Sequence, residues 1–256
     1  MEEFTKEDIA VAFSGGVDSS LLLKTACRAA EKSNKKVYAV TVNTTLHTLN
    51  DIEISKKVAE EFKAEHIIIN IDEIQNAGII DNPIDRCYRC KKYLFTEIKN
   101  EMQKLGVKTI IEGTNSDDLK EYRPGIKAIK ELQIISPLAE TEFTKHEIRQ
   151  LAEELNISVS NRPSTPCLAT RFPYGTTLNY KNIKKVETAE NFLKNFDLYN
   201  VRLRIHGNIA RLEVDEKDIL KVIEHRKEII DFLKNLDYYY ITLDLEGFRS
   251  GSMDIF

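Results

Sequence analysis

The sequence predicts an α/β fold: a doubly wound parallel sheet followed by a small α+β domain. Short apolar segments alternate with amphipathic helical segments between residues 9 and 155, and such alternation is typical of a parallel sheet with helices on both faces. A glycine pair, Gly15-Gly16, joins the first apolar segment to the first helical one. Beyond residue 175 the pattern changes to charged helices and short strands, which predicts a second domain.

The elements of the first domain follow from their residue patterns. Asn50 is expected to cap the second helix, and Gly106 to end the third. Thr144 and Glu147 predict a capping box at the start of the fourth. The predicted strands are 9–13, 37–42, 66–70, 109–111 and a short one at 134–135, and the predicted helices are 19–32, 51–62, 91–105 and 145–155.

The second domain is predicted to begin after residue 175, so that the two domains span 1–175 and 176–256. Gly207-Asn208 suits the turn of a β-hairpin. The predicted elements are a Lys/Glu-rich helix at 179–196, strands at 201–205 and 209–214, a helix at 218–233 and a strand at 239–245.

Composition and charge narrow the class of protein. Of the 256 residues, 42% are hydrophobic and 30% are charged, which excludes a disordered chain. The net charge of −4 makes a mainly nucleic-acid-binding role unfavourable. The chain lacks an apolar run near the roughly 18 residues of a membrane helix, and its start lacks the pattern of a signal peptide. We therefore expect a cytoplasmic protein with no membrane partner.

The glycine-rich turn predicts a phosphate site. Glycines let a ligand approach the backbone, and the following helix offers free N–H groups and a partial positive charge. The turn has neither the lysine of a Walker A loop nor the Gly-x-Gly-x-x-Gly of a dinucleotide site. The alternative is a tight turn that merely tolerates glycine. The candidate binding residues are Ser14, Gly15, Gly16, Asp18, Ser19 and Ser20.

Ser-Gly-Gly-x-Asp-Ser at this position resembles the loop of the ATP pyrophosphatases, or PP-loop enzymes, which have the adenine nucleotide alpha-hydrolase-like fold. The resemblance implies that the loop holds the pyrophosphate of ATP and its Mg²⁺-bound oxygens. Members of this superfamily adenylate a carbonyl or carboxylate, release pyrophosphate, and let a nucleophile displace AMP.

The cysteines suggest a metal or redox role. Cys87 and Cys90 precede the helix predicted from Lys91, and Cys167 lies in a loop stiffened by two prolines. A Cys-x-x-Cys redox pair would not need Cys167, whereas a zinc site would need His66 or His206 as a fourth ligand. An iron–sulfur cluster held by three cysteines fits the number best. Cys27 is expected to be a buried small hydrophobe.

Several motifs resemble signatures of the LarE family of ATP-dependent sulfur transferases. That family converts pyridinium-3,5-biscarboxylic acid mononucleotide to its thiocarboxylate during synthesis of the nickel-pincer nucleotide cofactor. The motifs are the segments 82–91, 112–118, 122–125, 136–140, 166–175 and 242–252, which cover most of the chain in the expected order.

The resemblance implies two possible sulfur sources. Relatives with one cysteine at the position of Cys167 sacrifice its sulfur. Relatives with three cysteines resemble this chain, and this implies a 4Fe-4S cluster on Cys87, Cys90 and Cys167 whose open iron carries a sulfide from an external donor. We favour the cluster because Cys87 and Cys90 would otherwise be unneeded.

An anionic nucleotide substrate calls for cations around its site. Arg123 and Arg171 match motif positions, whereas Asp118 could bind magnesium or substrate, or cap a helix. Arg202 and Arg204 alternate along one predicted strand, opposite Glu213. The resemblance implies that these residues bind the substrate phosphate or a metal, and the alternative is a solvated sheet face with salt bridges. The second domain is also expected to support a homo-oligomer.

Other functions remain open at this point. A tRNA thiolase could use the same loop and three cysteines, but the acidic balance argues against it. An ammonia-using amide synthetase would not need the cysteines. A nucleotide- or cluster-binding sensor would show no turnover.

Overall fold

The computed structural model describes residues 1–249 and 251–254. They form two compact units, the first made of Met1–Ile79 and Asp85–Thr165, the second of Ile80–Ile84 and the chain from Pro166 onward. The division therefore precedes the predicted boundary at residue 175, and the short segment Ile80–Ile84 joins the second unit. Ser250 of the C-terminal motif lies outside the described residues.

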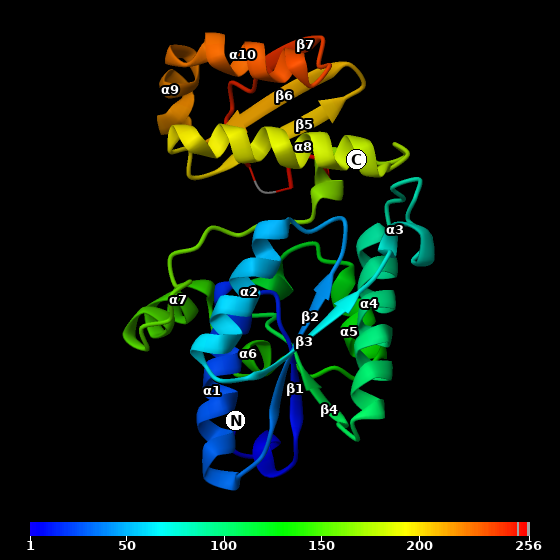
Figure 1. The fold of residues 1–256 in the computed structure, drawn as a ribbon, viewed down its shortest axis with the longest axis vertical. Coiled ribbons are helices and arrows are strands. Elements are labelled where there is room, and N and C mark those ends of the chain that lie inside the picture. Colours follow the sequence, from blue (N-terminus) through cyan, green and yellow to red (C-terminus); the bar gives the residue numbers. More distant parts are fainter. Residues whose placement is uncertain (250, 255–256) are drawn as a thin grey trace. The chain divides into compact units, whose positions relative to one another are not determined.

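The first unit contains a parallel sheet with the strand order β3-β2-β1-β4 (Figure 1). The strand predicted at 134–135 is reduced to a single bridge between Ile135 and Ile111, because the chain turns into a helix at Pro137 and leaves no room for a ladder. The strands are β1 (Ile9–Ala12), β2 (Val37–Asn43), β3 (Glu65–Asn70) and β4 (Thr109–Ile111).

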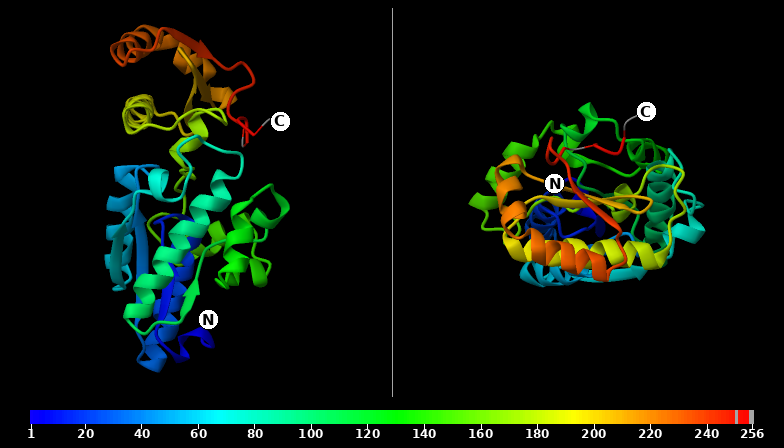
Figure 2. Two further views of the ribbon diagram at one scale, coloured as in Figure 1. Left: turned by 90° about the vertical axis from the view of Figure 1, so that its right-hand side faces the viewer. Right: turned by 90° about the horizontal axis from the view of Figure 1, so that it is seen from above.

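Helices cover both faces of this sheet, as a doubly wound fold requires. Figure 1 shows α1, α2 and α7 on one side, and Figure 2 shows α4 in front of the sheet from the other side. The α/β prediction is confirmed. The helices are α1 (Val17–Ser33), α2 (Leu49–Glu61), α3 (Glu73–Asn76), α4 (Arg86–Lys104), α5 (Gly125–Glu131), α6 (Pro137–Glu140) and α7 (Lys145–Glu154).

The central strand β1 explains why both faces are covered. Successive side chains of a strand point to opposite faces. Ile9 and Val11 pack in the cluster that includes α1 and α7, whereas Ala10 packs in the cluster that includes α4. All three are fully buried, so this strand is apolar throughout instead of alternating.

Helices α2 and α7 both begin at a capping box, but only that of α7 was predicted. The capping box of Thr144 and Glu147 is confirmed. The prediction that Asn50 caps α2 is wrong. Thr48 is the cap, because its hydroxyl accepts the Asp51 N–H and the Asp51 carboxylate accepts the Thr48 N–H. This reciprocal pair starts the helix at Leu49.

The second unit is a small α+β structure in which β5 and β6 form an antiparallel hairpin and β7 runs parallel to β6. The predicted turn is confirmed, with Gly207 at φ +60°. The helix predicted at 218–233 is instead divided at His225. The elements are α8 (Tyr180–Leu193), β5 (Val201–His206), β6 (Ile209–Val214), α9 (Ile219–Glu224), α10 (Arg226–Asn235) and β7 (Tyr240–Leu243).

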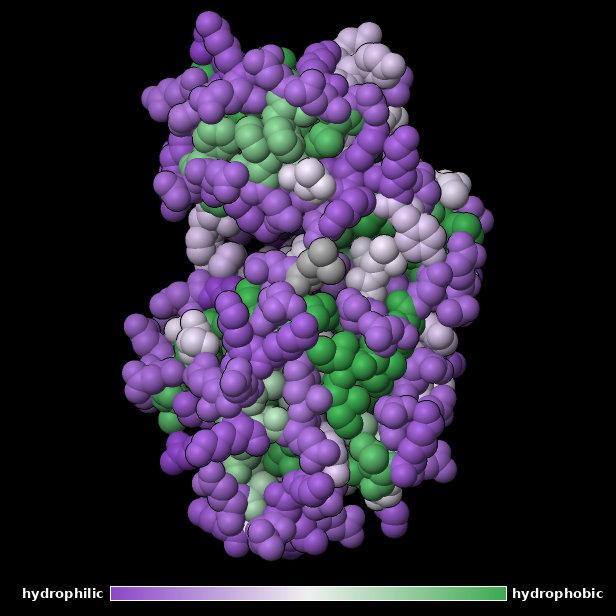
Figure 3. Space-filling model, in the orientation of Figure 1, coloured by the Kyte–Doolittle hydropathy of each residue, from purple (hydrophilic) through white to green (hydrophobic). Residues whose placement is uncertain are grey.

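Short 3-10 helices lie at Phe4–Lys6, Asp118–Lys120, Leu168–Arg171, Lys194–Phe196 and Glu216–Asp218. Figure 3 shows apolar side chains gathered on the surface of the second unit between α8 and α10, where the rings of Phe192 and Phe232 stack with centroids 3.8 Å apart. Among the described residues, no helix is both long enough and apolar enough to cross a membrane.

Candidate active site

The glycine loop between β1 and α1 has the geometry of an anion site. Gly15 has φ +69°, and a Cβ on it would lie 3.1 Å from the Cα of Ser55 in α2. Only glycine fits both the conformation and the close approach. Gly16 is the N-cap of α1, and no described side chain caps this end of the helix. The first N–H groups of α1 are therefore available to an anion.

Two of the predicted hydroxyls gather at this loop. The Oγ atoms of Ser14 and Ser19 are 3.2 Å apart, and the Ser19 hydroxyl donates to the Gly16 carbonyl over 3.1 Å. Ser20 differs, because it is fully buried and its Oγ has no hydrogen-bond partner within the described residues. A role of Ser20 in ATP binding stays a prediction.

Asp18, in the first turn of α1, connects the loop to two distant segments. Its carboxylate accepts a hydrogen bond of 3.2 Å from the Asn115 Nδ2 and forms an ion pair with the Lys145 ammonium. A Cβ on Gly113 would lie 3.0 Å from the Ser19 backbone nitrogen, so the chain after β4 packs directly against α1. Lys145 was not predicted as a site residue, because it lies 127 positions from Asp18 in the chain.

Asp118 and Arg123 are brought together beside this site. The Arg123 Nη2 lies 2.9 Å from the Asp118 Oδ1, and the Asn115 N–H donates to the other oxygen over 3.1 Å. Burial raises the pKa of the Asp118 carboxyl, and its two partners offset this only in part. The negative charge of Asp18 raises it further.

Glu112 holds the segment that follows β4, and it was not predicted as a site residue. Its buried carboxylate accepts hydrogen bonds from the Thr114 N–H (3.1 Å) and hydroxyl (2.9 Å), and from the Ser136 hydroxyl. The Lys91 ammonium in α4 lies 3.7 Å from this carboxylate. Glu112 thus connects the loop after β4 to the helix that carries the cysteine pair.

Cys87 and Cys90 lie one turn apart at the start of α4. The helix was predicted from Lys91 but begins at Arg86, so the pair belongs to the first turn instead of preceding it. An ion pair of 2.8 Å between Arg89 and Asp85 supports the earlier start. Cys87 is exposed and Cys90 is half-buried, so both thiols are reachable.

Two contacts with α5 hold this turn in place. The Tyr88 hydroxyl donates to Glu131 over 2.8 Å. A Cβ on Gly125, at the start of α5, would lie 2.8 Å from the Lys91 side chain. The cysteine pair therefore sits on a well-supported turn.

Cys167 belongs to the second unit, where it precedes the 3-10 helix Leu168–Arg171. It is half-buried, and its carbonyl accepts hydrogen bonds from the Thr170 N–H (3.1 Å) and hydroxyl (2.8 Å). The part of the chain that the structure describes holds no group of three His, Cys, Asp or Glu side chains placed to bind a metal ion. Burial raises the pKa of the remaining thiol, Cys27, to about 11, and Glu31 adds to this.

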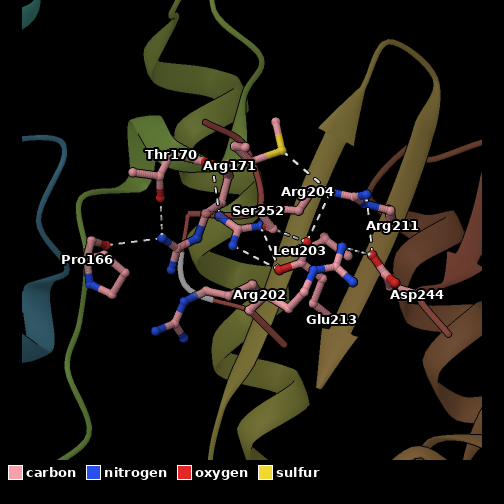
Figure 4. A network of polar contacts seen from close by, with 12 residues as sticks. Pro166, Thr170, Arg171, Arg202, Leu203, Arg204, Arg211, Glu213, Asp244 and Ser252 are labelled. Carbon is pink, nitrogen blue, oxygen red and sulfur yellow. Dashed lines mark hydrogen bonds and ion pairs between the residues drawn. The ribbon is translucent and has the colours of Figure 1, made fainter. Parts of the chain in front are cut away.

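The arginines predicted in the second unit form a buried ionic network (Figure 4). Arg204 donates to Glu213 over 3.0 Å and to the Thr170 carbonyl over 2.9 Å. Glu213 also accepts hydrogen bonds from Arg211 (3.0 Å) and from the Ser252 hydroxyl (2.7 Å). Arg204 and Glu213 are nearly or fully buried, so this sheet face is not solvated, although the salt bridges expected in that alternative are present.

Arg171 and Arg202 complete the network. Arg171 binds both oxygens of Glu190 in α8. Arg202 donates to the Val201 carbonyl over 2.8 Å and lies 5.1 Å from the ring centroid of Phe248. Burial, and then repulsion from Arg171, lowers the pKa of Arg202 to about 10. Burial also lowers the pKa of Arg204, against the favourable effect of Glu213.

The parallel fold and its uncapped glycine loop define an ATP-binding domain of the PP-loop class. A family model described as a PP-loop domain matches residues 1–123. The chain is 36% identical to the pyridinium-3,5-bisthiocarboxylic acid mononucleotide synthase of Lactiplantibacillus plantarum, over 96% of this chain and 88% of that protein.

Two further relatives cover nearly the whole chain. An uncharacterized protein of Synechocystis sp. is 34% identical over 95% of this chain and 91% of its own length. An uncharacterized protein of Methanocaldococcus jannaschii is 34% identical over 97% and 94%. The chain belongs to the LarE family and is an ATP-dependent sulfur-transferring enzyme.

Proposed function

We propose that this protein adenylates the carboxylates of pyridinium-3,5-biscarboxylic acid mononucleotide and converts them to thiocarboxylates, as a step toward the nickel-pincer nucleotide cofactor. The observation that carries the proposal is the 36% identity, over 96% of the chain, to a synthase named for the bisthiocarboxylic product. The uncapped glycine loop and the reachable cysteines support the same chemistry.

The first step is adenylation, because a free carboxylate is a poor electrophile. A carboxylate oxygen of the substrate forms a bond to the α-phosphorus of ATP, and the bond from that phosphorus to the bridging oxygen breaks, so that pyrophosphate leaves. The first N–H groups of α1 and the hydroxyls of Ser14 and Ser19 receive the pyrophosphate. Lys145 supplies positive charge at the same loop.

Asp18 would hold the Mg²⁺ that accompanies ATP. Nucleotide enzymes bind Mg²⁺ through one or two carboxylates together with phosphate oxygens. The Asp18 carboxylate lies at the loop and is partly exposed, so the donor present fits this ion. Lys145 and Asn115 orient the carboxylate from two sides.

The arginine network of the second unit suits the phosphate of the substrate. In this network Arg171 and Arg204 bind Glu190 and Glu213, and Arg202 lies on the same strand as Arg204. Arg211 also binds Glu213 and pairs with Asp244. The guanidinium groups of Arg171, Arg202 and Arg204 are buried, and a buried cation attracts an anion more strongly than a cation in water does. We propose Asp118 and Arg123 of the first unit as further substrate contacts.

For the sulfur source we propose a 4Fe-4S cluster on Cys87, Cys90 and Cys167. The donors fit in kind, because thiolates are the ligands of such clusters, and the three cysteines form no disulfide and are exposed or half-buried. The pair and Cys167 belong to different units, so binding requires Cys167 to meet the pair. When bound, the cluster would supply the sulfur that displaces AMP, renewed by an external sulfide donor.

Substrate-dependent release of pyrophosphate from ATP tests the reaction. We expect release to require the pyridinium biscarboxylate, with a product in which oxygen is replaced by sulfur, as seen by mass spectrometry. A mononucleotide with a single carboxylate, such as nicotinic acid mononucleotide, is the control. Release that does not depend on the biscarboxylate would contradict the proposal.

Iron and acid-labile sulfide in anaerobically purified protein test the sulfur source. We expect Cys87→Ala, Cys90→Ala and Cys167→Ala to lose iron, while Cys27→Ala keeps it, because Cys27 packs against the core. An iron-free enzyme whose Cys167 loses the mass of hydrogen sulfide during turnover would instead establish the sacrificial route. The homo-oligomer also stays a prediction, which light scattering checks.

A further inference from the structure

Arg162 has a position that the proposed reaction does not yet explain. Its Nη1 donates a hydrogen bond of 3.0 Å to the carbonyl of Gly15 in the glycine loop. Its Nη2 forms an ion pair with Asp51 at the start of α2. The planar guanidinium suits this double contact, because its donors point in fixed directions.

The partners of Arg162 are themselves held in place. One oxygen of Asp51 completes the capping box of α2 with Thr48, and the other binds Arg162. Arg149 of α7 donates to the carbonyls of Ser160 (2.8 Å) and Arg162 (3.0 Å). Hydrogen bonds therefore hold both the backbone of Arg162 and the Asp51 carboxylate that its side chain binds.

The contact with Gly15 determines the direction of an anion-binding amide. In a trans peptide the C=O of one residue and the N–H of the next point in opposite directions. By holding the Gly15 carbonyl, Arg162 directs the Gly16 N–H to the opposite side, where it donates to the Ser14 Oγ over 3.3 Å. This is the side on which Ser14 and Ser19 gather.

Arg162 also lies on the segment that leads to Cys167. Only Pro163, Ser164, Thr165 and Pro166 separate the two residues, and the prolines restrict that connection. We propose that Arg162 is a positioning residue that shapes the glycine loop for pyrophosphate and couples occupancy of this loop to the segment that carries Cys167.

Pyrophosphate binding to the full-length protein in the presence of Mg²⁺ tests the first part. A charge-assisted hydrogen bond corresponds to about a tenfold change in affinity or more, so we expect Arg162→Gln to bind pyrophosphate about tenfold more weakly. Arg162→Lys keeps the positive charge but loses the planar guanidinium with its several donors, and we expect a smaller loss of pyrophosphate affinity. Arg28→Gln, an exposed arginine of α1, makes the same change of charge and should bind like the wild type.

Hydrogen–deuterium exchange of residues 164–170 tests the coupling. Pyrophosphate should slow exchange of this segment in the wild type and in Arg28→Gln, but not in Arg162→Gln. Unchanged pyrophosphate affinity in both Arg162 variants would overturn the positioning role, and an unchanged exchange rate in the wild type would overturn the coupling. If Arg162→Gln does not fold, Arg162→Lys decides both points.

The inference rests on the ATP site of the proposed function and not on the identity of the carboxylate. Pyrophosphate binding needs no pyridinium substrate. Arg162-dependent binding without substrate-dependent release would therefore reject the proposed reaction alone.

Discussion

Arg171 and Glu190 are joined by two hydrogen bonds of 2.8 and 2.9 Å, and both side chains are buried. Arg171 also donates to the carbonyls of Pro166 (3.2 Å) and Cys167 (3.3 Å). The Arg171–Glu190 ion pair therefore connects the loop that contains Cys167 to α8. Burial alone would raise the pKa of the Glu190 carboxyl, but the attraction and hydrogen bonds of Arg171 outweigh this and lower it.

Glu190→Gln should destabilise the second unit strongly, because it leaves the Arg171 charge buried without a counter-ion. We expect a loss of about 3 kcal/mol in the free energy of unfolding, measured by urea denaturation at neutral pH. A lowered folded pKa stabilises above the ordinary value of 4.5, so the difference should shrink as the pH falls below it. Asp237→Asn, which breaks an exposed pair with Lys185, should cost less; an equal loss in both variants would contradict the prediction.

Glu73 should make stability depend on pH in the opposite sense. It is fully buried, and this burial raises the pKa of its carboxyl above 4.5, although Leu46 donates its N–H over 3.0 Å. A raised folded pKa favours folding below 4.5, and this contribution is lost as the pH rises through the folded value. Glu73→Gln, neutral at every pH, should therefore unfold at a higher temperature than the wild type at about pH 8. Equal melting temperatures at that pH would contradict the prediction.

Gly15→Ala should abolish ATP binding, because the left-handed backbone and the 3.1 Å approach of Ser55 both exclude a Cβ. Gly106→Ala is the matched control. Gly106 has φ +75°, with no described heavy atom within 4 Å of its Cβ position. We expect the control to lose about 1 kcal/mol of stability and keep ATP affinity, as measured by urea denaturation and calorimetry. Normal ATP binding by a folded Gly15→Ala protein would refute the role of the loop.

Lys145→Gln should weaken ATP binding about tenfold, because the glycine loop loses its compensating ammonium beside Asp18. Titration calorimetry with Mg²⁺–ATP measures the effect. Lys130→Gln, on the exposed face of α5, makes the same change of charge and should leave the affinity unchanged. The same affinity in both variants would remove Lys145 from the ATP site.

Much of the fold could be predicted because its central strands, β1 and β2, are largely buried on both faces. A buried parallel strand such as β1 is apolar at every position, and this is visible in the sequence. Helix starts were harder, since Thr48 and Asn50 are both good caps and the contact with Asp51 decides between them. The early start of α4 is accompanied by the Arg89–Asp85 ion pair, and no apolar pattern reveals either of them.

The site could be predicted where its residues are neighbours in the chain. The glycine loop is continuous, so its composition alone indicates an anion site. Lys145 and Arg162 contact that loop from far along the chain. The chain has 37 lysines and arginines, and nothing in the sequence shows which of them contact the loop. The alternating charges of β5 left a solvated face possible, because burial of Arg204 and Glu213 becomes visible only in the folded unit.

The bond between Arg162 and Gly15 joins residues 147 positions apart, and the contact of Lys145 with Asp18 spans 127. Contacts of such separation form late, because the chain between them must first be brought together. During translation, the glycine loop emerges early but cannot reach its finished shape until residue 162 has left the ribosome. The nascent protein should therefore bind nucleotide more weakly than the finished protein until the chain up to Arg162, five residues before Cys167, has been synthesised.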